Sequence, residues 1–414
     1  MGINELNQQR LITKVLSNQM LKTFFWQFIA AVTTFCAYIQ WNRLFGSDEV
    51  AKLFILLAAF GLINDFLDFG GCSWSIRSLL YEEISKIEFA RFFMGRVIRI
   101  ITIYSFMAIL ALFLGLDIDL IIVLVIVPIG QLVGTYLQQY CIATEKYALS
   151  GCGTLFERLA WNFPSLAIVI WFPSEHVLYY SICAGSVIQI IFVLSVSRKF
   201  QLPFFRCRPN LNDFVMSMKF EKASRKIGIS SVITDFYGQD TFLISQFSSL
   251  DVAGEYSLIQ KNRNIAILGF SIFASRFRFM GNLSNTDFRK FVWQSAWILL
   301  CNVTVLSIVF FVPLPLVNLI FGYSSEILVE SFRWSILSFA FFGFISIIQG
   351  YLFAMKQDMF LQKFSIIMVP LTLIFTTVGA KIDGTYGASI SIAILSAIQL
   401  FWLFFYTFSK TRKY

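Results

Sequence analysis

The sequence predicts an all-α integral membrane protein of about 12 transmembrane helices, arranged as two six-helix lobes related by a pseudo-two-fold axis along the membrane normal. Three observations support this fold class. The 414 residues are 57% hydrophobic and only 14% charged, whereas about a quarter of the residues in a soluble domain are charged. The apolar residues form runs of about 20, the length that a helix needs to cross about 30 Å of hydrocarbon. A polar turn between two such runs also occurs twice, once in each half.

The repeated turn is Phe45–Phe54 (FGSDEVAKLF), which returns without a gap as Phe247–Tyr256 (FSSLDVAGEY). The Phe, Ser and Val-Ala positions coincide, Glu49 corresponds to Asp251, and each copy closes on an aromatic residue. A long apolar run precedes each copy and another follows it. We therefore interpret the chain as an internal duplication, in which each turn joins the first two helices of a lobe.

The apolar runs give six candidate spans on each side of a polar linker. They are Thr23–Trp41, Val50–Phe69, Val97–Leu116, Leu120–Tyr140, Leu155–Phe172, Val177–Val196, Ile227–Phe247, Ala253–Ala274, Val292–Val312, Ser335–Met355, Ser365–Ala380 and Gly387–Phe408. This division gives an N-terminal lobe of residues 1–200, a basic linker of residues 201–226 and a C-terminal lobe of residues 227–414. The polar N-terminus lacks the pattern of a cleavable signal peptide, so we expect insertion to start from the first span.

The basic residues predict the orientation. With the N-terminus in the cytoplasm, the outside turns contain only Arg43, Lys52, Arg333 and Lys381. The inside segments contain Arg10, Lys14, Lys22, Arg77, Lys86, Arg91, Arg96, Arg99, Lys146, Arg198, Lys199, Arg206, Arg208, Lys219, Lys222, Arg225, Lys226, Arg276, Arg278, Arg289, Lys290, Lys356, Lys363, Lys410, Arg412 and Lys413. This positive-inside pattern predicts that both termini are cytoplasmic. The net charge of +9 is then explained by topology and by anionic membrane lipid, and it gives no reason to expect nucleic-acid binding.

The loops between the spans differ in length and character. Gly71–Arg96 mixes apolar and charged residues and predicts an amphipathic helix at the membrane interface. Arg198–Lys226 contains two prolines and eight basic residues, which favours a connector held against the anionic inner leaflet. The outside turns are short and offer no room for an extracytoplasmic active site. The seven cysteines include no close pair, and we interpret them as apolar packing residues.

Polar and charged side chains within the spans are the candidate binding residues, because a charge near the middle of a span costs roughly 2.5–3.5 kcal/mol. The candidates are Gln260, Lys261, Arg263 and Asn264 in the eighth span, Asp235 and Asp240 in the seventh, Arg158 and Asn162 in the fifth, Asn64 and Asp65 in the second, and Arg43 after the first. We expect the charged residues of the seventh and eighth spans to face a polar cavity. Mutual neutralisation of these two sets of charges is the alternative.

Structural roles also compete for the other candidates. Arg158 follows Glu157 near the inner interface, where both side chains could snorkel to the lipid headgroups. Asp65 and Asp68 could pair with basic residues of the interfacial segment and hold helices together. His176, the only histidine, lies in an outside turn. No nucleophile elbow, phosphate-binding glycine loop or metal-ligand spacing occurs, so no catalytic residue and no metal site are predicted.

Three motifs resemble those of the Wzx-type polysaccharide flippases, which transport O-antigen repeat units and belong to the multidrug/oligosaccharidyl-lipid/polysaccharide exporter superfamily. Arg43–Gly46 with Asp48 and Glu49 resembles the family's Arg-Leu-Leu-Gly-Pro-Glu-Glu turn, Asp68–Gly70 followed by Arg77 resembles its Asp-x-Gly segment, and Val252–Ser257 resembles its Val-Gly-x-Tyr-Ser helix opening. Two departures occur in the first copy, where Ser47 replaces the usual Pro and Ala51–Phe54 lacks the Gly before the aromatic residue. The resemblance extends over the whole chain in helix count, lobe division and spacing.

The resemblance implies a flippase of the bacterial cytoplasmic (inner) membrane. Such a protein moves a polyprenyl-pyrophosphate-linked oligosaccharide, an O-antigen or capsule repeat unit, from the cytoplasmic to the periplasmic leaflet by alternating access. It implies no cofactor, with H+ or Na+ as the candidate coupling ion, and a polysaccharide polymerase and glycosyltransferases as candidate partners. Lys and Arg suit the pyrophosphate, and Asn, Gln, Tyr and Asp suit sugar hydroxyls.

Other functions remain open at this point. A drug or cation antiporter of the same superfamily would bind its substrate through carboxylates within the membrane, for which Asp65, Asp68 and Asp235 are candidates. A membrane-embedded O-antigen polymerase or lipid-linked glycosyltransferase is disfavoured by the short outside turns and the missing catalytic residues. A purely structural membrane subunit is disfavoured because charges within its spans would be costly.

Overall fold

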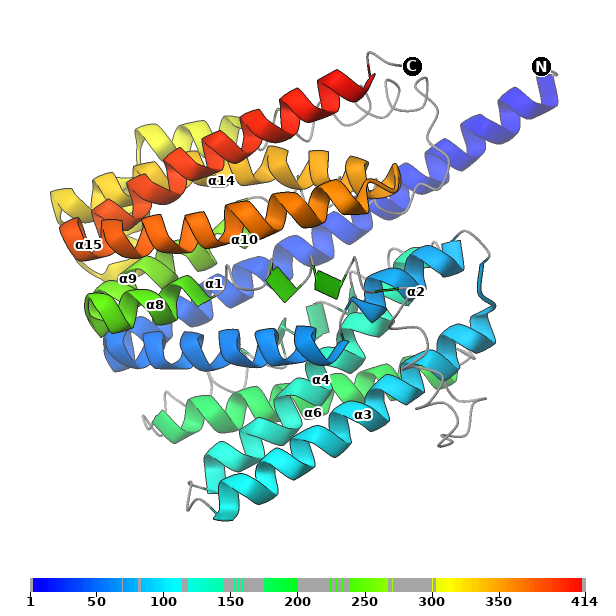
Figure 1. Cartoon of the computed structure of the whole chain (residues 1–414), viewed down its shortest axis with the longest axis horizontal. Helices are drawn as coiled ribbons and strands as arrows, with labels where there is room; N and C mark the ends of the chain where they lie inside the picture. The colour runs from blue at the N-terminus through cyan, green and yellow to red at the C-terminus, as the bar shows by residue number, and fades with distance from the viewer. Residues whose placement is uncertain are drawn as a thin grey trace.

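The computed structural model describes residues 3–68, 70–80, 83–113, 118–144, 175–199, 239–266 and 303–411, with shorter stretches at 152–153, 155–156, 158–159, 162, 224, 228–229, 232–233, 270 and 300. The described elements are helices, and most of the long ones run roughly along one direction and form a bundle (Figure 1). The described chain begins at Ile3 and stops at Thr411, and both of these residues lie at the same end of the bundle (Figure 1).

The first element, α1 (Ile3–Asp68), contains the first two predicted spans as two arms that fold back at Gly46. Gly46 has a φ of 84° and a ψ of 169°, which residues with a β-carbon rarely adopt. The chain therefore reverses direction within the repeated turn, as the sequence predicts (Figure 1). We call this end of the bundle the Gly46 end, and the opposite end, where α2 lies, the Arg77 end.

The segment Gly71–Arg96 is not the single amphipathic helix that the sequence predicts. It contains α2 (Gly71–Leu80) and the first turns of α3 (Lys86–Phe113). Ser85 starts α3 through a capping box. Its hydroxyl accepts a hydrogen bond from the Glu88 N–H (3.2 Å), and the Glu88 carboxylate accepts one from the Ser85 N–H (2.7 Å). This pairing satisfies backbone groups at the helix start and fixes the break before α3.

Two further helices of the N-terminal half, α4 (Ile118–Ala143) and α6 (Glu175–Lys199), agree with the predicted fourth and sixth spans. They pack closely because α4 presents glycines to α6. A β-carbon on Gly130 would lie 2.7 Å from the Ser186 β-carbon, and one on Gly134 would overlap the Gln189 side chain. Small residues let membrane helices approach in this way.

The C-terminal half contains α8 (Asp240–Phe247), α9 (Leu250–Lys261), α10 (Arg263–Ala266), α13 (Leu314–Phe321), α14 (Glu326–Ala354) and α15 (Asp358–Thr411). The predicted eighth span is divided between α9 and α10. The helix α13 was not predicted. It is bent by 83° from the helix Val303–Phe311, because Pro313 cannot continue the preceding helix. The last two predicted spans form α15, which folds back at Asp383 and Gly384 at the Gly46 end (Figure 1).

The two halves share a buried apolar core. Trp41 and Phe54 of α1 pack in one cluster with Leu258 and Ile259 of α9 and with Phe332 of α14. This cluster joins the second arm of α1 to α9, the helices that follow the two copies of the repeated turn. This contact between the halves therefore involves the elements that follow the two similar turns.

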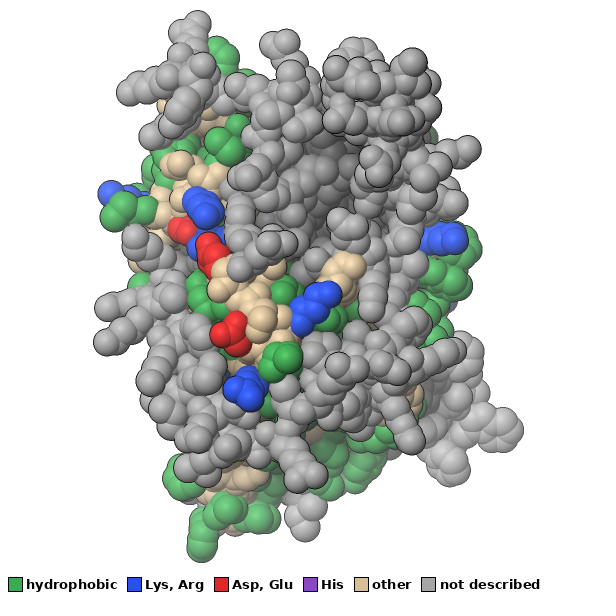
Figure 2. Space-filling model, turned by 90° about the vertical axis from the view of Figure 1, so that its right-hand side faces the viewer, with side chains coloured by type: hydrophobic (Ala, Val, Ile, Leu, Met, Phe, Trp, Pro, Cys, Tyr) green, Lys and Arg blue, Asp and Glu red, His purple; other side chains and the backbone are tan. Residues whose placement is uncertain are grey.

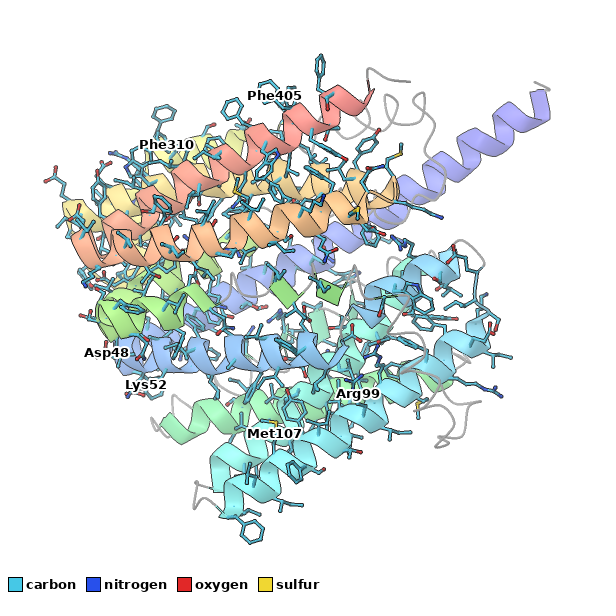
Figure 3. The ribbon with its side chains drawn as sticks, in the orientation of Figure 1. Asp48, Lys52, Arg99, Met107, Phe310 and Phe405 are labelled. Carbon is cyan, nitrogen blue, oxygen red and sulfur yellow. The ribbon has the colours of Figure 1, made fainter. Side chains whose placement is uncertain are left out.

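The outer surface and the helix lengths are those of a membrane protein. Within the described residues, 4 helices are long and apolar enough to cross a membrane, and they lie in α1, α3, α14 and α15. Phe405 of α15 projects away from the bundle and is 65% exposed (Figure 3). Many other large apolar side chains of the described helices are also exposed. Apolar exposure over so many residues is typical of a lipid-facing surface. Most of the predicted span Leu155–Phe172 and parts of Ile227–Phe247, Ala253–Ala274 and Val292–Val312 lie outside the described residues.

Candidate functional site

At the Gly46 end, the two copies of the repeated turn contact each other. The Ser47 hydroxyl donates a hydrogen bond to the Asp251 carboxylate, and a β-carbon on Gly254 would overlap the Ser47 carbonyl oxygen. Arg43 donates to the Leu319 carbonyl oxygen of α13 at 2.8 Å. Figure 3 shows Asp48 and Lys52 at this end, beside the same turn. These contacts close the two halves together at the Gly46 end.

Glu255 connects three elements of the C-terminal half at the same end. Its carboxylate accepts hydrogen bonds from the Tyr323 hydroxyl (2.9 Å) and the Thr385 hydroxyl (2.7 Å). Burial and the neighbouring Glu255 carboxylate raise the pKa of Tyr323 to about 12. Tyr323 is therefore a neutral hydrogen-bond donor at physiological pH, and α9 is held against the turns before α14 and within α15.

At the Arg77 end, the halves are joined by ion pairs. The Arg77 guanidinium donates to both carboxylate oxygens of Asp358, at 2.9 and 2.7 Å, and it also lies 5.2 Å from the centroid of the Phe353 ring. Lys356 lies 3.9 Å from Glu83. Viewed at this end, acidic and basic side chains lie next to one another on the described surface (Figure 2). Described contacts thus join the two halves at both ends of the bundle.

Between the two ends lies a cluster of charged side chains from both halves, which we call the Lys261 cluster. Lys261 of α9 interacts electrostatically with Asp240, Arg263 and Arg158. The Lys261 ammonium lies 5.0 Å from the centroid of the Phe54 ring, and the Arg263 guanidinium lies 4.9 Å from that of Phe342. The structure therefore brings together four of the residues that the sequence singled out.

Asp240 is the acidic member of the Lys261 cluster. Its carboxylate accepts hydrogen bonds from the Tyr256 hydroxyl at 2.8 Å and from the Thr241 N–H at 2.8 Å. Gln239, the residue before it, donates to the Ala58 carbonyl oxygen of α1 at 2.9 Å. Asp240 is thus fixed at the start of α8, beside the second arm of α1.

The N-terminal half contributes Arg158 to the cluster, and Asn162 lies four residues further along the chain. The Asn162 amide donates to the Thr34 hydroxyl of α1 at 3.0 Å, and Arg158 interacts electrostatically with Tyr38, one turn further along α1. Gln260, next to Lys261, has a buried side-chain amide with no hydrogen-bond partner among the described residues. Its donor and acceptor are chemically suited to a bound ligand.

A second polar cluster lies within the N-terminal half. Asp68 accepts hydrogen bonds from the Tyr136 hydroxyl (2.7 Å) and the Cys72 N–H (2.9 Å), and it interacts electrostatically with Arg96 and Asp65. Asn64 bonds to Gln131 (3.3 Å) and Tyr104 (3.1 Å). These contacts join α1, α2, α3 and α4. Arg96, which the charge pattern assigned to the interface, has an exposed fraction of 0%.

The other predicted candidates lie elsewhere. Arg43 is exposed at the Gly46 end, and no described contact brings it into the Lys261 cluster. Asp235 and the side chain of Asn264 lie outside the described residues. Within those residues, no group of three His, Cys, Asp or Glu side chains could hold a metal ion. The sequence did not single out Phe54, whose ring faces the Lys261 ammonium. A signal was present, because the repeat aligns Phe54 with Tyr256, which donates a hydrogen bond to Asp240.

Solved transporter structures match this fold over nearly the whole chain. A MATE protein in complex with MaL6 matches with a TM-score of 0.69 and 12% identity, over 96% of this chain and 98% of that chain. The lipid II flippase MurJ, in an inward closed conformation, matches with a TM-score of 0.68 and 13% identity, over 93% and 87%. An outward-facing multidrug resistance MATE family transporter of the MOP superfamily matches with a TM-score of 0.64 and 11% identity, over 95% of each chain.

The chain shares its fold with these solved transporters. No protein-family model matches the sequence, and none of the curated proteins matches it. The matched structures include a multidrug resistance transporter and a lipid flippase, so the shared fold alone does not indicate a substrate.

Proposed function

We propose that this protein is a flippase for a polyprenyl-pyrophosphate-linked oligosaccharide, an O-antigen or capsule repeat unit. In this proposal, the Lys261 cluster binds the pyrophosphate, polar groups such as the Gln260 amide bind sugar hydroxyls, and the polyprenyl chain stays in the lipid. Anionic membrane lipid and the enzymes that build and polymerise the glycan are the proposed partners.

The charge of the Lys261 cluster is the observation that supports the proposal. Lys261 and Arg263 both interact with the Asp240 carboxylate and with each other, and Lys261 also interacts with Arg158. Like charges within a membrane protein are unfavourable unless an opposite charge balances them. A bound pyrophosphate would bring negative charge to these cations, and Lys and Arg are the side chains that bind phosphate oxygens best.

The position of the cluster suits alternating access. It lies between the two halves, and contacts join these halves at the Gly46 end and at the Arg77 end. Opening one end at a time would expose the cluster to one side of the membrane and then to the other. By the positive-inside pattern, the Arg77 end and both termini are cytoplasmic, and the Gly46 end faces the periplasm.

A drug or cation antiporter is the second candidate, since multidrug transporters share the fold. Its substrate would need carboxylates within the membrane. The Asp68 carboxylate already accepts two hydrogen bonds and interacts with Arg96, and Asp240 faces two cations. These surroundings favour an anionic substrate over a cationic one.

Binding measurements on the purified protein in lipid nanodiscs test the proposal. We expect polyprenyl pyrophosphate to bind the wild type, and Lys261→Gln and Arg263→Gln each to weaken this binding by about tenfold or more, the effect of losing a charged hydrogen bond. Lys52→Gln is the matched control, because Lys52 lies at the Gly46 end, paired with Glu49. In cells, the two cluster variants should lower surface-glycan display at unchanged protein level. Tight binding of a quaternary ammonium dye with no binding of the pyrophosphate lipid would favour the antiporter.

A further inference from the structure

The contact between Lys261 and Phe54 crosses the interface between the halves. Phe54 belongs to the second arm of α1, and its side chain is 1% exposed. The Tyr38 ring packs edge-on against it, at 5.0 Å between centroids and 80° between planes. The Phe54 ring is therefore held in place by its own half, and it presents one face to an ammonium from the other half at 5.0 Å.

This contact lies directly inward of the closed Gly46 end. Phe54 follows Ser47 by seven residues, and Lys261 follows Gly254 by seven residues. Seven residues are about two turns, or about 10 Å along a helix. Ser47 and Gly254 are themselves in close contact. The contact between Lys261 and Phe54 therefore lies about two turns inward of the contact between Ser47 and Gly254, towards the centre of the bundle.

We propose that Phe54 is a positioning residue, whose ring holds the Lys261 ammonium while no anionic ligand is bound. An anionic headgroup competes with the ring for this ammonium, because a phosphate is the stronger partner of a cation. Since Phe54 and Lys261 belong to different halves, the exchange of partners removes a contact that holds the Gly46 end closed. Occupancy of the site is thereby linked to opening. This inference rests on the proposed function for the identity of the ligand.

Fluorinated phenylalanines at position 54 test the resting contact without any ligand. Each added fluorine weakens the negative face of the ring with little change in its size. In a background without the native cysteines, spin labels at Asp48 and Gln246 report the separation of the Gly46 end. We expect a graded shift towards longer distances with two and three fluorines at position 54, and no gradation when Lys261→Met is also present.

Phe60 is the matched control for this series. It lies in the same arm of α1, belongs to the same apolar cluster and is also 1% exposed. The same analogues at Phe60 should leave the distances unchanged. An equal response at both positions, or none at position 54, would show that Phe54 only fills space and would overturn the inference.

Binding of polyprenyl pyrophosphate to the same variants tests the competition. Because fluorine weakens the attraction between the ring and Lys261, each added fluorine at position 54 should raise the affinity for the lipid. The total gain should reach about 2- to 30-fold, the factor that corresponds to a cation–π contact. If the wild type binds the lipid but the affinity shows no gradation, the role of Phe54 is overturned while the proposed function stands. If the distances respond but no variant binds the lipid, the proposed function fails, and the exchange step fails with it.

Discussion

Ser47 donates a hydrogen bond to Asp251, a residue 204 positions away in the sequence. The two residues belong to the two copies of the repeated turn, so these two turns are similar in sequence and also contact each other. Gly254 allows this approach, because a β-carbon there would overlap the Ser47 carbonyl oxygen. In the proposed orientation this contact closes the periplasmic side.

Gly254→Ala should loosen the Gly46 end. The added methyl group must displace the backbone of Ser47, and overpacking of this kind costs about 1–3 kcal/mol. Spin labels at Asp48 and Gln246 should show a longer distance than in the wild type. Gly61→Ala is the control, because a β-carbon at Gly61 meets nothing within 4 Å. Identical distance distributions for both variants would show that the close approach of Gly254 does not hold this end shut.

The Arg77–Asp358 pair should hold the opposite end closed. Both side chains are mostly buried, at 15% and 16% exposure, and a doubly hydrogen-bonded pair of this kind is worth about 1–3 kcal/mol. Asp358→Asn should therefore increase the rate at which a cysteine-reactive reagent labels a single cysteine placed at Ser78, which is 1% exposed.

The control for this prediction is Lys356→Gln. The pair of Lys356 with Glu83 is 3.9 Å long, with exposures of 56% and 53%, so its loss should change stability by less than about 1 kcal/mol. Unchanged labelling in Asp358→Asn, at wild-type stability, would mean that the pair does not contribute to closure.

Asp240→Asn should tighten the binding of an anionic headgroup several-fold. The substitution removes the negative charge that competes with the ligand for Lys261 and Arg263, while the amide oxygen can still accept the hydrogen bond from Tyr256. Calorimetric titration with polyprenyl pyrophosphate measures the effect, and Asp48→Asn at the Gly46 end serves as the control. Weaker binding in Asp240→Asn would instead show that the carboxylate contacts the ligand directly.

Arg96→Met should destabilise the N-terminal half by about 1–3 kcal/mol, because it removes a buried charged hydrogen bond and the cation that interacts electrostatically with Asp68. Arg96 also donates to the Leu67 carbonyl oxygen at 2.7 Å. Denaturant unfolding in detergent micelles measures the loss. Arg91→Gln, an exposed position on the same helix, should stay within about 0.5 kcal/mol of the wild type. Equal stability of the two variants would contradict the structural role of Arg96.

The sequence alone determined the membrane class, the repeated turn and most of the span positions. These features are local, because a span needs about 20 consecutive apolar residues and a reversal at Gly46 needs a glycine. The sequence did not reveal α13 or the break before α3. Each depends on a single short signal, Pro313 in one case and the Ser85 cap in the other, within segments whose composition also suits another arrangement.

Only the tertiary structure decided which charges meet. Lys261 and Arg263 were candidates by their sequence position, but their grouping with Arg158, the pairing of Arg77 with Asp358 and the burial of Arg96 follow from how helices far apart in the chain pack. Hydropathy records the depth of a residue in the membrane and not the direction of its side chain. The partner of a charge within a span is therefore set by helix packing, which no local pattern in the sequence encodes.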